Sequence, residues 1–202
     1  MTPESLMNSF AGEPQARDEG GIAMRSPIDL ERFTEFQLLD FRMNCRRQIA
    51  GILFEGRMAL DLDEGDTGVL VAREVVEFQW ESEVRVSSST AWNSITAEIS
   101  DSGDLLALEM EFMPVAKLRI LARALGFFEV KADRLSGIGI PDYAASENEI
   151  KSALVDWETP VAVVRKYELL SRSLACVLIS GPFRCETTPA AMIRARWSAW
   201  SP

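Results

Sequence analysis

The chain contains no histidine among its 202 residues. Histidine is the commonest general base near neutral pH and the commonest side-chain ligand of transition metals. Its absence excludes Ser-His-Asp and Cys-His catalysis and any zinc site that needs an imidazole. We therefore expect no metal and no cofactor, and we favour a protein that is not an enzyme. Carboxylate, lysine, tyrosine or cysteine chemistry stays open.

Cysteine and long apolar runs are scarce as well. Cys45, Cys176 and Cys185 are widely spaced and form no CxxC pair, which argues against a disulfide framework or a zinc knuckle. The apolar run at 175–179 is too short to span a bilayer, and no basic region followed by an apolar region is visible at the N-terminus. These features predict a cytoplasmic protein without a membrane partner.

The composition is that of a folded protein, with 47% hydrophobic and 26% charged residues. Residues 1–26 mix Pro, Glu, Gly, Ser and Asn with little periodicity, which predicts a flexible leader in which Met24 is an alternative start. Residues 27–202 are long enough for one core, and we interpret them as a single α+β domain.

Period-2 alternation of apolar and polar residues dominates the first half of this domain and is typical of half-buried strands. The pattern predicts an antiparallel β-meander of about six to nine strands packed with two to four helices. The clearest strands are expected at 39–45, 49–54, 58–62, 69–71, 76–86, 92–99, 106–112 and 128–132.

Helices are predicted where the spacing lengthens toward 3.6 residues. Leu118, Leu121, Ala122 and Leu125 would share one helix face, with Gly126 at the C′ position. Residues 28–38 and the segment after Thr188-Pro189 are further helix candidates. Ser146 and Glu149 have capping-box spacing ahead of a helix over 147–157. Residues 160–172 fit a helix or a strand, and we favour a strand paired with 174–179.

Negative charge is concentrated in residues 60–112. This segment holds 13 acidic residues against Arg73 and Arg85, a net charge of −11, so the rest of the chain sums to +1. Because many of these acids occupy the polar phase of alternating strands, we expect them on one sheet face or its turns. The face would either keep the protein soluble or dock a basic partner. The candidate contact residues are Asp61, Asp63, Glu77, Glu81, Glu109 and Glu111.

Two shorter motifs resemble ligand loops and fail on spacing. The run from Asp61 to Asp66 has its glycine one place too early for an EF-hand loop, and Ala72 stands where the bidentate glutamate would be. The pair Gly137 and Gly139 lacks the third glycine and the following helix of a dinucleotide loop. Both are interpreted as ordinary turns.

The C-terminal residues include Arg196, Trp197 and Trp200. Trp and Arg dominate interface hot spots, so this tail is a second candidate contact with a partner or another copy of the chain. Docking of the tail on its own domain explains the same residues.

Three functions follow. The first hypothesis is a binding or regulatory protein whose acidic sheet face docks a basic protein, as an immunity-like inhibitor or a chaperone would. The same field repels phosphates, so no direct nucleic-acid binding is expected there. The second is a His-free enzyme or small-ligand binder with a pocket between sheet and helices. The third is a structural subunit that forms a homo-oligomer through its Trp-rich tail.

Overall fold

The computed structural model describes residues 1–10, 34–59, 65–83 and 91–171. Two short α-helices lie in these ranges, α1 (Pro3–Ser9) and α2 (Glu147–Ser152), with a 3-10 turn at Asp133–Leu135. The strands are β1 (Gln37–Asn44), β2 (Ile49–Glu55), β3 (Thr67–Arg73), β4 (Glu77–Ser82), β5 (Trp92–Ser102), β6 (Leu105–Met113), β7 (Ala116–Ala122), β8 (Ala124–Lys131) and β9 (Ala162–Leu170).

The nine strands form one antiparallel sheet in the order β4-β7-β6-β5-β1-β2-β3-β8-β9. The predicted antiparallel sheet is thus confirmed, with few helices beside it. The range of two to four helices stays a prediction, because residues 172–202 lie outside the described part of the chain.

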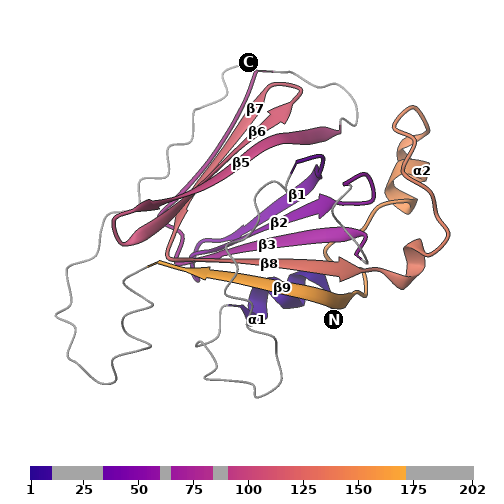
Figure 1. Cartoon of the computed structure of the whole chain (residues 1–202). Helices are drawn as coiled ribbons and strands as arrows, with labels where there is room; N and C mark the ends of the chain where they lie inside the picture. The colour runs from indigo at the N-terminus through magenta and orange to yellow at the C-terminus, as the bar shows by residue number, and fades with distance from the viewer. Residues whose placement is uncertain (11–33, 60–64, 84–90, 172–202) are drawn as a thin grey trace.

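The sheet folds into two halves that face each other (Figure 1). The four-strand half contains β4, β7, β6 and β5, and the five-strand half contains β1, β2, β3, β8 and β9. They are joined where β5 pairs with β1 at only two positions, Gln37 with Asn93 and Leu38 with Trp92. A core cluster fills the space between the halves, with Phe54 and Leu70 from the five-strand half and Leu108 and Ile120 from the four-strand half.

The other face of the five-strand half is buried too. All residues of β2 and β3, and all but the last of β8, are buried. A second core cluster lies on this face, where Leu6 and Met7 of α1 meet Val155 and Trp157. Figure 1 shows α1 beneath these strands, away from the four-strand half. The central strands are therefore packed on both sides, which explains their nearly continuous apolar sequence.

α1 lies inside the segment predicted to be a flexible leader. Thr2 and Ser5 form a capping box, and Pro3 occupies the first turn, where its missing N–H is not needed. Leu6, Met7 and Phe10 are buried, and the Glu4 N–H donates to the carbonyl of Trp157. Residues 1–10 therefore belong to the folded domain, and residues 11–26 lie outside the described residues.

The helix predicted from Leu118, Leu121, Ala122 and Leu125 is wrong, because these residues lie in β7 and β8. Leu118, Ile120 and Ala122 face the core between the halves, and Leu125 and Phe127 face it again one strand later. The chain passes from one half of the sheet to the other at Arg123, where the inward phase changes from even to odd residue numbers. The core-facing residues Ala122 and Leu125 are therefore three positions apart within a pattern of period 2, and this spacing resembles that of a helix.

Several other predictions have clear outcomes. The strands expected at 39–45, 92–99 and 106–112 are confirmed as β1, β5 and β6. The strand expected at 58–62 is wrong where it is described, because Arg57 and Met58 lie in a turn. Of the helix expected over 28–38, residues 28–33 lie outside the described residues, and residues 37 and 38 begin β1 instead.

Two predictions concern the region after β8. The capping box of Ser146 and Glu149 is confirmed, but α2 ends at Ser152 rather than at Trp157. The chain turns back to the sheet there, and the Trp157 Nε1–H donates to Asp40 Oδ2 at 2.8 Å. The segment 160–172 contains strand β9, which pairs with β8; the predicted partner at 174–179 lies outside the described residues.

We expect Gly51→Ala to destabilise the protein, because a Cβ at this position would lie 2.7 Å from Met7 Sδ and 2.8 Å from the Trp157 ring. Overpacking of this kind costs about 1–3 kcal/mol of unfolding free energy, measurable by urea denaturation. Gly139→Ala is the matched control, because no atom lies within 4 Å of its added Cβ. Equal stability of the two variants would contradict the packing of α1 and Trp157 on β2.

Candidate functional site

The outer face of the four-strand half carries the largest group of carboxylates in the described sheet. The strand register places Glu77 and Glu81 of β4, Glu98 of β5, and Glu109 and Glu111 of β6 on this face. Their side chains alternate with Phe78, Trp80, Met110 and Phe112, which point toward the core. We call these five carboxylates, with the β7 side chains between them, the acidic face.

Strand β7 brings two cations into the acidic face. Lys117 lies beside Glu81 and Glu111, and Arg119 lies beside Gln79 and Glu109. The Lys117 ammonium is 2.7 Å from Glu111 Oε1, and the Arg119 Nε is 3.5 Å from oxygens of both Glu77 and Glu109. With five carboxylates and two cations, the face keeps a net charge of −3.

These ion pairs are exposed, so each contributes little to the stability of the fold. Their electrostatic effect is visible at Lys117, where the hydrogen bond and charge of Glu111 raise the pKa of the ammonium, with smaller contributions from Glu81 and Glu109. Lys117 therefore lies in a negative field to which several carboxylates contribute.

Glu98 and Glu109 are directly opposite each other on β5 and β6. Like charges in this position destabilise a sheet. Arg119 approaches Glu109 from the other side, whereas Glu98 makes no ion pair within the described residues. Among the described residues, no cation therefore compensates the charge of Glu98 on the acidic face.

Only some of the site residues predicted from the sequence lie in the described part of the structure. It brings Glu77, Glu81, Glu109 and Glu111 together on the acidic face. Asp61, Asp63, Arg196, Trp197 and Trp200 lie outside the described residues. Glu98 was not among the predicted contact residues, although its spacing from Glu109 across the turn at 103–104 could have indicated it. Lys117 and Arg119 were missed because the predicted helix hid their alternation.

Other acids of the segment 60–112 serve local structure away from this face. The Asp66 carboxylate accepts hydrogen bonds from the Ala132 N–H and the Thr67 hydroxyl. Glu74 lies 3.5 Å from Arg123 Nε. Arg73, counted among the opposing charges, is buried, and its guanidinium lies over the Phe10 ring. The charge block of the sequence is therefore divided between several places in the fold.

An aromatic row lies behind the β4 end of the acidic face, on the inner side of the sheet. It consists of Phe41, Phe78, Trp80, Trp92 and Phe112. The Trp80 ring centroid lies 5.5 Å from those of both Trp92 and Phe112, and that of Phe41 lies 5.3 Å from Phe78. Phe78, Trp80 and Trp92 are half-buried, and Phe41 is 37% exposed. The row is thus an apolar surface that the described residues cover only in part.

A buried ion pair fastens the 138–153 segment to the sheet. Glu55 is fully buried, and its two oxygens accept from Arg57 Nε at 2.7 Å and Nη2 at 2.8 Å. The same guanidinium donates to the carbonyls of Ile138, Gly139 and Ala153. Because these donors are all used within the chain, we interpret the pair as a structural clamp and not as a ligand site.

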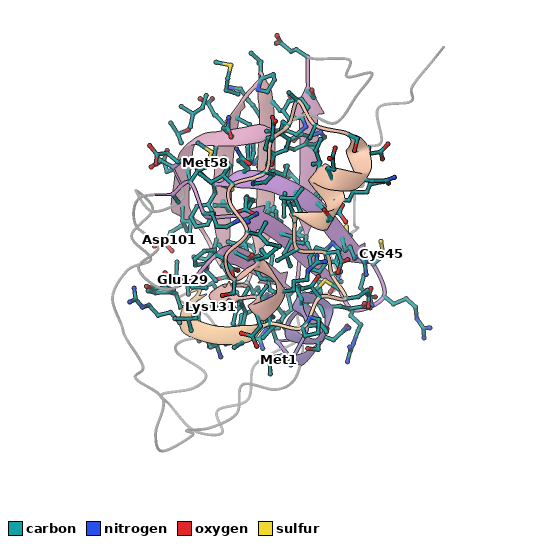
Figure 2. All side chains as sticks on the ribbon, turned by 90° about the vertical axis from the view of Figure 1, so that its right-hand side faces the viewer. Met1, Cys45, Met58, Asp101, Glu129 and Lys131 are labelled. Carbon is teal, nitrogen blue, oxygen red and sulfur yellow. The ribbon has the colours of Figure 1, made fainter. Side chains whose placement is uncertain are left out.

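Tyr143 extends this clamp. Its hydroxyl donates to Gln37 Oε1 at 2.5 Å, and Gln37 Nε2 reaches Met58 Sδ at 3.5 Å. Burial raises the pKa of Tyr143 to about 12; the charge of Glu55 adds to the rise and that of Arg57 opposes it. Figure 2 shows Met58 toward the left of the view and Cys45, which is exposed, toward the right.

Comparison with known proteins adds no assignment. No protein-family model matches the chain, and no curated protein matches it.

In the part of the chain that the structure describes, no helix is long and apolar enough to cross a membrane. Within the same ranges, no three acidic or cysteine side chains are grouped so that they could hold a metal ion.

We expect Tyr143→Phe to remove part of the alkaline pH dependence of stability. The pKa of Tyr143 is raised from 10.0 to about 12 on folding, so its contribution is complete below pH 10 and is lost as the pH rises toward 12. The stability difference between the natural protein and the variant should therefore begin to shrink at about pH 10 and continue to shrink toward about pH 12 in urea denaturation. A stability difference that stayed constant over this pH range would contradict the raised pKa of Tyr143 as the source of the pH dependence.

We expect Glu98→Gln to stabilise the fold by about 0.5 kcal/mol at low salt, because it removes the like charge opposite Glu109. The gain should diminish at high salt, where exposed charges are screened. Glu111→Gln is the control on the same face, since it removes the partner of Lys117 and should bring no gain. Thermal unfolding at low and high salt measures the stability of both variants. If Glu98→Gln brought no gain at low salt, the result would contradict the repulsion between Glu98 and Glu109.

Proposed function

We propose that the protein is a binding module that holds a basic protein partner against the acidic face. The observation that carries the proposal is the incomplete compensation of this face, on which Glu98 lies opposite Glu109 and has no ion pair with any residue that the structure describes. A partner that places Lys or Arg there would relieve the repulsion between these two carboxylates. Such complementarity increases the rate and specificity of association more than its affinity.

The geometry also favours a protein partner over other classes. The carboxylates project from neighbouring strands of one sheet, which is a broad surface and not a concave site for a small molecule. Their field repels phosphate groups, so the proposal excludes nucleic acid from this face. An inhibitor or chaperone acting in the cytoplasm on a basic protein remains the proposed biological setting.

The proposal predicts that charge on the acidic face matters more than charge elsewhere. We expect the triple variant Glu81→Gln, Glu98→Gln and Glu109→Gln to bind labelled decalysine about tenfold more weakly than the natural protein at about 20 mM salt. The binding should weaken steeply as salt rises. Fluorescence anisotropy of the labelled peptide measures both effects.

The matched control changes the net charge equally at exposed acids of other surfaces, by Glu147→Gln, Glu158→Gln and Glu168→Gln. It should weaken decalysine binding much less, because the removed charges lie outside the acidic face. Equal weakening by the two triple variants would show that only the overall charge of the protein attracts the peptide, and would overturn the proposal.

A further inference from the structure

Strand β4 is an edge of the sheet and is regular along its length. It pairs with β7 from Glu77 to Ser82 without a register shift, and no other described strand lies beside it. The opposite edge strand, β9, is interrupted by a register shift against β8. Natural sheets protect their edges with bulges, prolines or charged side chains; β4 has no bulge or proline, and its only charged residues are acidic. Of the two edges, β4 is therefore the one shaped to accept another strand.

The backbone of β4 offers hydrogen bonds on its free side. The Glu83 N–H donates to the Val115 carbonyl, so in this register Glu77, Gln79 and Glu81 exchange their hydrogen bonds with β7. Paired residues alternate in an antiparallel ladder, and the N–H and C=O groups of Phe78 and Trp80 consequently point away from β7. These groups are at the spacing that an incoming strand requires.

The side chains of β4 define which sequence such a strand would need. Residues directly opposite each other in a sheet project on the same face. Positions opposite Phe78 and Trp80 would lie on the inner side, against the partly exposed aromatic row. Positions opposite Glu77, Gln79 and Glu81 would lie on the acidic face, where basic side chains find opposite charges. The complementary segment therefore alternates apolar and basic residues.

We propose that the β4 edge binds an extended segment of alternating basic and apolar residues, which adds a strand to the four-strand half. This inference rests on the proposed function and specifies how the basic partner docks. Backbone hydrogen bonds would provide affinity, and the alternating side chains would provide specificity.

Pairing of β4 with the same strand of a second copy is disfavoured in its two most central registers. Antiparallel pairing of two β4 strands centred on Gln79 would place Glu77 opposite Glu81, and pairing centred on Trp80 would place Glu77 opposite Glu83. Each arrangement brings like charges together on one face and is destabilised. The charges of β4 thus disfavour these two self-pairings and favour a basic partner.

The test compares two labelled peptides of identical composition and about nine residues. One alternates lysine with valine or threonine, and the other carries its lysines in one block. The full chain should bind the alternating peptide at least about tenfold more tightly by fluorescence anisotropy. Binding should also slow hydrogen exchange at the Phe78 and Trp80 amides, measured by NMR, because these N–H groups become bonded.

A pair of variants tests the edge itself. Trp80→Ala and Trp80→Pro both remove the indole, but only proline removes the outward N–H and blocks the approach of a strand. Proline is tolerated on an edge strand where the N–H faces outward, so both variants should fold. We expect Trp80→Pro to bind the alternating peptide at least about tenfold more weakly than Trp80→Ala.

The outcomes separate the two proposals. Equal affinity for both peptides, together with unchanged exchange at Phe78 and Trp80, would overturn the added strand. If the triple variant of the acidic face still weakened binding, the proposed function would stand without it. If the acidic-face and control variants behaved alike as well, both proposals would fall. Should Trp80→Pro fail to fold, the two peptides and hydrogen exchange on the natural chain still decide the question.

Discussion

Burial of the central strands on both faces is the constraint on which the rest of the structure depends. β2, β3 and β8 are apolar on both sides, so neither face can be left to water. One face is covered when the sheet folds over itself and packs β6 and β7 against it. The other is covered by α1 and by the loop that carries Val155 and Trp157. The short helices and the two halves of the sheet are consequences of this requirement.

The fold of the sheet over its own core also determines where charge can lie. The four-strand half has a buried inner face and an exposed outer face, so its polar residues are confined to one side. Strand β7 enters this half between β4 and β6, and Lys117 and Arg119 are thereby placed between the carboxylates of the neighbouring hairpin strand β6 and those of β4, which is distant in sequence. The acidic face is a product of strand order as much as of composition.

Buried charged groups are stabilised by pairing and hydrogen bonds, and not by exposure to water. Glu55 is fully buried, yet its charge is matched by Arg57, whose remaining donors bond to carbonyls of the 138–153 segment. A buried charge is tolerated only when it is paired and hydrogen-bonded in this way. The carboxylates of the acidic face have no such need, because they remain in water. This contrast separates charged groups that hold the protein together from charged groups that stay at its surface.

The sequence determined the local structure in several segments where one periodicity continued without interruption. The alternation in residues 39–45 and 106–112 is enough to predict β1 and β6, and the spacing of Ser146 and Glu149 is enough to predict the start of α2. It failed at Arg123, where the strand crosses between the halves and its inward phase changes, so that two strands resembled a helix. It also identified four carboxylates of the candidate site. It could not predict the cations beside them, because strand order depends on long-range packing.

What the sequence alone established is that the domain is acidic and rich in antiparallel strands. Only the tertiary structure decided which charges share a face and which strand is left at the edge, since both follow from how the apolar faces are covered.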